Sequence, residues 1–225
     1  MRRIAFVNEK GGTGKTTLAV HLAAWAAEHR GQRVLLVDLD TQGHAGKSLG
    51  LDVRSLTPNA FHWLTDKTVQ FVDVARPTAF RRLTVVPAYK QLQELSSALA
   101  GQDRPRHRLA DRVAEVSGSF DLVVIDAPPS LGPAVSNVLV AATEVVLPVA
   151  LTYLALDGCA EVAQTVERVA REQAVPGLHI SAVVPMLVRI DRPNAVPLYE
   201  PISQMVYALK ADDVRDVMVL SLIHI

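Results

Sequence analysis

Short apolar runs alternate with longer amphipathic stretches along this chain. The apolar runs predict strands at Arg3–Asn8, Arg33–Asp38, Leu83–Pro87, Asp121–Asp126, Glu144–Val149 and His179–Pro185. Helical patterns between them cover Lys15–Arg30, parts of Asn59–Thr65, Lys90–Leu99, His107–Val116, Pro133–Ala141 and Leu156–Gln173. Strands that read as continuous apolar runs and alternate with helices indicate a parallel sheet covered on both faces. The pattern therefore predicts a single α/β domain over residues 1–225, built on a doubly wound, mainly parallel sheet.

One stretch of this pattern has nearly the length of a membrane span. Val138–Leu156 is almost entirely apolar over 19 residues. Glu144 and Pro148 interrupt the run. A buried strand between two helices explains it better than a transmembrane helix does. We therefore expect no stable membrane insertion.

The segment with the clearest chemistry lies between the first predicted strand and the first predicted helix. Lys10–Thr17 reads Lys-Gly-Gly-Thr-Gly-Lys-Thr-Thr, and Glu9 stands where the general phosphate-loop pattern has its first glycine. Glycines let backbone N–H groups approach phosphate oxygens, and the helix N-terminus adds its dipole. Lys15 would supply a charge to the β- and γ-phosphates, and Thr16 can ligate Mg²⁺. The loop predicts ATP and Mg²⁺ as cofactors, with the nucleotide held by Gly11, Gly12, Thr13, Gly14, Lys15, Thr16 and Thr17.

Carboxylates follow two of the predicted strands. The second strand ends in Asp38-Leu39-Asp40, and the fourth places Asp126 after four apolar residues. Ligands bind at the carboxyl ends of the strands in open α/β sheets, so these carboxylates are expected near the loop. A carboxylate in the position of Asp126 is typical of a strand that holds Mg²⁺ through water.

The three motifs together resemble those of a known family. The form K-G-G-x-G-K-T, matched by Lys10–Thr16, is the mark of the deviant-Walker P-loop ATPases, which include ParA-type partition proteins and MinD. The segment from Asp38 to Gly43 resembles D-x-D-P-Q-G of the ParA-type members, with Thr41 in place of the proline. Asp126-Ala127-Pro128-Pro129-Ser130 is close to their D-x-P-P-S segment, whereas MinD-like members differ after the aspartate. The resemblance extends from about Arg2 to Val188.

This resemblance implies a P-loop NTPase fold and a ParA-type partition ATPase that is slow unless a partner stimulates it. Catalysis would rest on Lys10, Lys15 and Asp40, with Lys10 reaching across an ATP-bound homodimer to the partner's phosphates and Asp40 orienting the attacking water. Thr16, Asp38 and Asp126 would serve the metal. The implied partners are non-specific DNA and a ParB-like protein, and the implied function is to segregate DNA or position intracellular cargo.

Two alternatives remain open at this point. A MinD-like ATPase would cycle on a membrane, and it would need an amphipathic C-terminal helix that Val217–Ile225 does not resemble, since the segment lacks basic residues. A small-molecule ligase or kinase on the same fold would use Lys10 within its own subunit and would need a substrate pocket beside the γ-phosphate.

Composition and charge change this picture little. Lys and Arg together number 23, as do Asp and Glu, so nucleic-acid binding would need a local patch. The seven histidines have no zinc-ligand spacing, and the single cysteine, Cys159, excludes an intrachain disulfide and favours a reducing, cytoplasmic location. The resemblance to ParA-type proteins implies association with the nucleoid. Two basic sets are candidates for contact with DNA or an acidic partner. The first comprises Arg76, Arg81, Arg82, Lys90, Arg104, Arg106, Arg108 and Arg112, and the second Arg168, Arg171, Arg189 and Arg192.

The last part of the sequence fits the family pattern poorly. Three prolines between Ile190 and Asp216 limit regular structure, and the chain then runs through the apolar, β-prone segment Val217–Ile225. An exposed run of this kind is an aggregation hazard, so it is either a buried strand or not native. We expect the part after about residue 189 to be truncated or altered.

Overall fold

The computed structural model describes residues 1–130, 132–150 and 155–186, and the side chains of residues 155–157 are left out of the description. Arg189, Arg192 and the apolar segment Val217–Ile225 therefore lie outside the described residues, as does the expectation that the end of the chain is not native.

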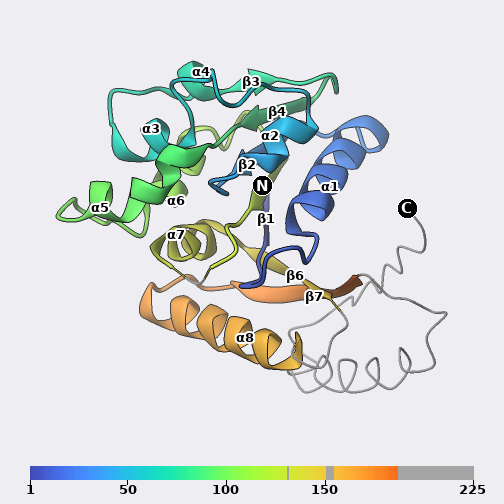
Figure 1. Cartoon of the computed structure of the whole chain (residues 1–225), viewed down its shortest axis with the longest axis vertical. Helices are drawn as coiled ribbons and strands as arrows, with labels where there is room; N and C mark the ends of the chain where they lie inside the picture. Colours follow the sequence, from blue (N-terminus) through green and yellow to red (C-terminus); the bar gives the residue numbers. More distant parts are fainter. Residues whose placement is uncertain (131, 151–154, 187–225) are drawn as a thin grey trace.

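The centre of the protein is a seven-stranded sheet in the order β3-β4-β2-β5-β1-β6-β7 (Figure 1). Its strands are β1 (Arg2–Phe6), β2 (Val34–Asp38), β3 (Arg76–Pro77), β4 (Leu83–Val86), β5 (Leu122–Asp126), β6 (Glu144–Ala150) and β7 (His179–Met186). All pairs are parallel except the short edge pair of β3 and β4. The α/β fold with a doubly wound, mainly parallel sheet is confirmed.

The helices connect these strands in alternation. They are α1 (Lys15–His29), α2 (His44–Ser48), α3 (Ala60–Thr65), α4 (Phe71–Val74), α5 (Leu95–Leu99), α6 (Arg108–Glu115), α7 (Pro133–Ala141) and α8 (Ala155–Glu172), with the 3₁₀ helix η1 (Lys90–Glu94) before α5. The helical pattern predicted over Lys90–Leu99 is found there, although the segment begins as a 3₁₀ helix and continues as a short α-helix. The sequence also missed β3, α2 and α4, since elements of two to five residues show no hydrophobic period.

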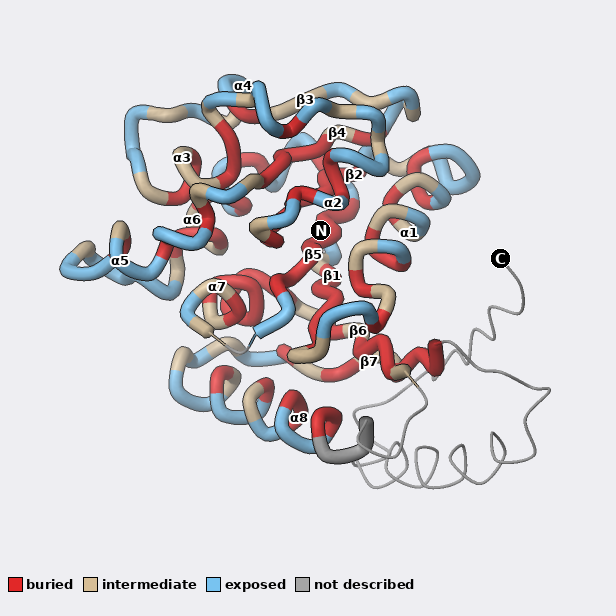
Figure 2. The backbone as a smooth tube through the Cα atoms, in the orientation of Figure 1, coloured by how far each residue is buried: buried red, intermediate tan, exposed pale blue. Residues whose placement is uncertain are grey.

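Two apolar cores lie on the two faces of the sheet. Ala5, Leu35 and Val123 point to the face covered by α6, α7 and α8, and the residues that precede them on each strand point to the face covered by α1. Figure 1 places α1 and α7 on opposite sides of the strands, and Figure 2 shows buried backbone concentrated between them. Because side chains alternate along a strand, each strand supplies both cores and reads as a continuous apolar run.

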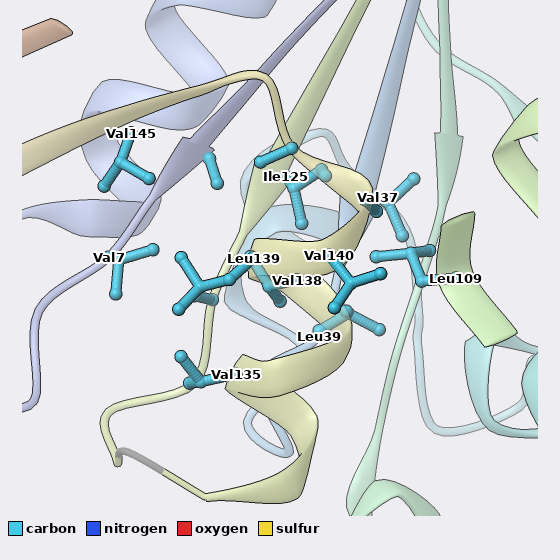
Figure 3. Close-up of a cluster of buried hydrophobic side chains, with 14 of the residues drawn as sticks. Val7, Val37, Leu39, Leu109, Ile125, Val135, Val138, Leu139, Val140 and Val145 are labelled. Atoms are coloured by element: carbon cyan, nitrogen blue, oxygen red, sulfur yellow. The ribbon is translucent and has the colours of Figure 1, made fainter. Parts of the chain in front are cut away.

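Helix α7 is an example of a helix whose buried side chains pack against the sheet. Val135, Val138 and Leu139 are fully or almost fully buried, and Figure 3 shows them in one cluster with Val7, the residue after β1, and Ile125 of β5. The apolar run Val138–Leu156 thus begins as the end of this helix and continues into β6. Among the described residues, no helix has both the length and the apolar character needed to cross a bilayer.

Candidate functional site

The loop between β1 and α1 has the backbone conformation that phosphate binding needs. Gly12 and Gly14 have φ angles of +73° and +87°, in the region that favours glycine. Gly14 is the residue before the first turn of α1, and its carbonyl accepts from Leu18 N at 3.0 Å. At Gly11 and Gly12, no heavy atom lies within 4 Å of the position that a Cβ would take. The loop therefore presents open backbone at a helix N-terminus, where anions bind.

Asn8 fixes the start of this loop, a role that the sequence analysis did not assign. It is 5% exposed, and its Nδ2 donates to Pro148 O at 2.6 Å while its Oδ1 accepts from Lys10 N at 2.9 Å. Val7 N also donates to Val146 O at 3.1 Å. The loop is therefore attached to the end of β6, which is adjacent to β1 in the sheet. An asparagine at the end of the predicted strand Arg3–Asn8, directly before the glycine-rich loop, was the available signal.

The side chain of Lys15 hydrogen-bonds to the backbone at the start of the loop. The side chain is 6% exposed, and its Nζ donates to Lys10 O at 2.9 Å. Burial lowers the pKa of Lys15, while the nearby carboxylates of Asp126 and Asp40 oppose that shift. The ammonium is thus held over the loop, close to two of the three predicted carboxylates.

Two of those carboxylates end adjacent strands. Asp38 of β2 and Asp126 of β5 are register partners, and both side chains are 0% exposed. Asp38 Oδ1 accepts from Asp40 N at 3.0 Å, and Oδ2 accepts from Ala45 N at 3.1 Å. Burial raises the pKa of Asp38 well above its ordinary value, and the charge of Asp126 adds to the shift. Asp38 therefore connects the end of β2 to the first turn of α2.

Asp40 lies in the turn between β2 and α2. It is 8% exposed, and its Oδ1 accepts from Gln42 N at 2.9 Å. This bond fixes the turn even though Thr41 replaces the proline of the family pattern. Asp40 is close enough to Lys15 and Asp126 to affect the pKa of each.

Asp126 differs from the other carboxylates because both of its oxygens are buried without a well-formed hydrogen bond to the described residues. Burial raises the pKa of Asp126 to about 7, although the Thr16 side chain and Lys15 favour the charged form. A buried, unpaired carboxylate is costly unless a cation compensates it. Asp40 also lies near enough to add its negative charge, and Lys15 is the cation that acts on Asp126. The donor set therefore fits Mg²⁺.

The protein groups alone would not enclose that ion. The described residues contain no group of three or more His, Cys, Asp or Glu side chains arranged to hold a metal. Mg²⁺ is commonly held by one or two carboxylates together with waters and substrate phosphates. The arrangement of Thr16 and Asp126 beside an open phosphate loop matches a magnesium site that waters and substrate phosphates complete.

The structure thus brings together Lys15, Thr16, Asp38, Asp40 and Asp126, as the sequence predicted. Thr17 is exposed, and its carbonyl contacts His21 Nδ1 at 2.7 Å. The side chain of Lys10 lies beside the first turns of α8, where its Cε is 3.7 Å from the position of a Cβ on Gly158.

The first basic set does not form one free surface, which corrects the sequence interpretation. Arg108 and Arg112 are 9% and 6% exposed and donate to the carbonyls of Leu64 and Trp63. Arg76 and Arg82 also donate to backbone carbonyls, including those of Pro58 and Gly31. The remaining four are exposed: Arg81, Lys90, Arg104 and Arg106.

Asn137 of α7 is a buried polar residue that the sequence analysis did not single out. It is 1% exposed, its Oδ1 accepts from Leu109 N at 3.2 Å, and its Nδ2 donates to Pro105 O at 2.9 Å. The side chain therefore joins α7 to the start of α6.

Cys159 is also buried, and burial raises the pKa of its thiol to about 11, so the thiol is neutral at pH 7.

The chain is similar to known proteins over most of its length. A family model described as an AAA domain matches residues 1–180. The chromosome partitioning protein ParA of Myxococcus xanthus is 39% identical over 169 residues, which cover 75% of this chain and 59% of that protein. The protein of the same name from Caulobacter vibrioides is 34% identical over 221 residues, covering 97% of this chain and 80% of the relative.

A solved structure is similar over most of the fold. Cobyrinic acid a,c-diamide synthase from Mycobacterium smegmatis, with a bound ATP analog and magnesium, superimposes with a TM-score of 0.85. It is 30% identical, and the match covers 91% of this chain and 80% of that one. With the K-G-G-x-G-K-T loop at the carboxyl edge of the sheet and partition proteins among its relatives, the chain belongs to the deviant-Walker P-loop ATPase family of ParA-type proteins and MinD.

Proposed function

We propose that this protein is a partition or positioning ATPase that binds ATP with Mg²⁺ and hydrolyses it. The observation that carries the proposal is the unpaired Asp126 carboxylate beside Lys15 and Thr16 at the mouth of an open phosphate loop. The similarity to partition proteins from two bacteria supports the biological role. Because the chain spans only 59% of the length of the Myxococcus relative, the activity of the whole protein belongs to this proposal.

Each site residue has a role that follows from its place. The backbone N–H groups of Gly11–Thr17 and the ammonium of Lys15 bind the phosphates. Thr16 and Asp126 would hold the metal, and Asp38 would help to bind the water of the metal while it keeps α2 against the end of β2. Bound Mg²⁺ supplies compensation for the charge on the phosphate oxygens. Asp40 orients the attacking water from the turn that follows β2.

ATP binding is proposed to dimerise the protein through Lys10. In this arrangement the lysine of each protomer reaches the phosphates bound to its partner. Two anionic nucleotides at a shared interface are tolerable only when positive groups cross it. Hydrolysis then releases the dimer. A slow basal rate follows if a ParB-like partner is needed to bring Asp40 into its position for catalysis.

The ATP-bound dimer is proposed to bind DNA without sequence preference and to act at the nucleoid in the cytoplasm. Exposed basic residues that could contact phosphate include Arg81 and Arg106. Contacts of this kind weaken steeply with salt because bound counterions are displaced. Equal DNA affinity of the ATP-bound and nucleotide-free forms would contradict this part of the proposal.

Light scattering with ATP and Mg²⁺ tests the dimer. Wild type is expected to shift from monomer to dimer, and Lys15→Ala is expected to lose nucleotide binding altogether. Lys10→Ala is expected to bind ATP weakly and remain monomeric, because its own loop stays intact. An ATP-saturated wild-type monomer would overturn the shared interface.

A second function is favoured by one specific observation. The Mycobacterium smegmatis synthase shares the fold at 30% identity, so an enzyme acting on a small molecule with ATP is the alternative. In that case Lys10 would act on the nucleotide of its own subunit. The alternative predicts ATP turnover that depends on a small-molecule substrate and that is insensitive to dimerisation or DNA.

A further inference from the structure

The side chain of Asn8 lies at the point where the chain leaves β1 for the phosphate loop. The backbone pairing of β1 with β6 ends at Phe6 and Val146, and Val7 N still donates to Val146 O at 3.1 Å. Two residues further along β6, Pro148 O accepts from Asn8 Nδ2 at 2.6 Å in a buried bond. The side chain thus continues the attachment to β6 beyond the last backbone pair.

The oxygen of the same amide holds the backbone of Lys10. Asn8 Oδ1 accepts from Lys10 N at 2.9 Å, in the turn that asparagine commonly forms with the residue two positions later. The carbonyl of Lys10 accepts from Lys15 Nζ at 2.9 Å and from Thr13 Oγ1 at 3.4 Å. The backbone N–H of residue 10 is therefore fixed by Asn8, and its carbonyl holds the ammonium of Lys15.

The glycines that follow contribute little to fixing this end of the loop. At Gly11 and Gly12 no heavy atom lies within 4 Å of a Cβ position, and a glycine backbone adopts many conformations. The other end is packed, because Met186 Cε lies 2.5 Å from the position that a Cβ would take on Gly14. The loop is therefore held by α1 and β7 at Gly14, and by β6 through Asn8 at its start.

We propose that Asn8 is a positioning residue for nucleotide binding, because it holds the start of the loop and Lys15 in place before a phosphate arrives. The inference rests on the proposed function, in which the loop and Lys15 bind the phosphates. Without the two bonds of Asn8, the segment between β1 and Gly12 has more conformations to lose when it binds. The free energy of that ordering is subtracted from the affinity. Asn8 thus strengthens binding through Lys10 and Lys15.

Isothermal titration calorimetry of the full chain with ADP and Mg²⁺ measures this contribution. ADP is the probe because the proposed function ties dimerisation to ATP, so that dimerisation does not add to the signal. Asn8→Ala removes both bonds and is expected to raise the ADP dissociation constant about tenfold, which corresponds to about one or two net hydrogen bonds. Asn8→Ser keeps an oxygen that can accept from Lys10 N but is too short to reach Pro148 O as well. It is expected to raise the constant about threefold.

Asn137→Ala is the matched control. Asn137 is also a buried asparagine, and its amide also joins two segments, since it accepts from Leu109 N and donates to Pro105 O. Both alanine variants are expected to lower the melting temperature of the nucleotide-free protein. Well below that temperature, Asn137→Ala is expected to bind ADP with wild-type affinity. A side chain at position 8 that served only stability would give the same result as this control.

Hydrogen exchange provides a second readout of positioning. In nucleotide-free Asn8→Ala, the backbone amides of residues 10–14 are expected to exchange faster than in wild type, because the start of the loop has lost its attachment to β6. Saturating ADP is expected to restore the slower exchange, since the bound phosphates then hold the loop. Exchange that is equal in the nucleotide-free variant and wild type would contradict the proposal.

The outcomes distinguish this inference from the proposed function. A wild type that binds neither ADP nor ATP contradicts the proposed function itself. A wild type that binds ADP, with Asn8→Ala of equal affinity or with Asn137→Ala weakened to the same extent, overturns the role of Asn8 alone. If Asn8→Ala does not fold, Asn8→Ser carries the same test, and wild-type affinity in that variant overturns the inference.

Discussion

Replacing Arg112 is expected to destabilise the protein without changing its surface. Its Nε donates to Trp63 O at 2.7 Å in a buried bond, and one terminal nitrogen donates to Asp66 O at 2.7 Å. Arg112→Met keeps most of the aliphatic stem and removes the donors. An unsatisfied buried carbonyl costs about 1–3 kcal/mol, and the partly buried second bond contributes about 1 kcal/mol. We expect a loss of about 3 kcal/mol in the free energy of unfolding.

Urea unfolding followed by circular dichroism measures this loss. The midpoint is expected to fall while the slope stays constant, because the surface exposed on unfolding does not change. For a chain of this size, about 3 kcal/mol corresponds to a fall of roughly 6–12 °C in melting temperature. Arg106→Met, at an exposed position in the same basic set, is the control and is expected to leave both values unchanged.

The result also separates a structural arginine from a DNA-binding one. Folded Arg112→Met is expected to bind DNA with wild-type affinity, because the side chain is only 6% exposed. A loss of less than about 1 kcal/mol together with a clear fall in DNA affinity would refute the reasoning and return Arg112 to the binding surface.

Three further predictions concern other parts of the molecule. Asp40→Ala is expected to retain ATP binding and to block single-turnover hydrolysis, because it removes the group proposed to orient water and leaves the phosphate loop intact. Asn137→Asp is expected to destabilise the protein at neutral pH more than Asn137→Ala does in urea unfolding, because it places a buried carboxylate against Pro105 O. For pH dependence, the hydrogen bond from Arg33 lowers the pKa of Asp121 from 3.8 to about 2. Its contribution to stability is therefore present above pH 3.8 and lost as the pH falls through about 2, and acid unfolding of Asp121→Asn is expected to lack this component.

Each of these three predictions has an outcome that would contradict it. Unchanged hydrolysis by Asp40→Ala would remove its proposed role. Equal stability of the two Asn137 variants would mean that solvent reaches the site. An acid-unfolding curve of Asp121→Asn that matches wild type would show that the ion pair with Arg33 does not affect stability.

The sequence alone was sufficient for the fold class and for the six longer strands, but not for β3, α2 and α4. Its strands are buried on both faces, so each forms an apolar run whose place along the chain can be recognised without knowing its neighbours. The glycine-rich loop is equally local, because its conformation depends on the glycines themselves and on the helix that follows. Parallel strands align their carboxyl ends, which is why Asp38 and Asp126 could be expected near Lys15 before any contact was known.

Only the tertiary structure decided which polar groups are paired. Asp38 and Asp126 end similar strands, yet Asp38 accepts hydrogen bonds from α2 while Asp126 has no well-formed bond among the described residues. Arg112 and Arg106 belong to one basic segment, but the former is buried against α3 and the latter is exposed. Sequence patterns report the period of burial along one element, whereas these partners come from elements distant in the chain. Hydrogen bonds and desolvation act between such neighbours, so their effects are fixed only when the fold brings the elements together.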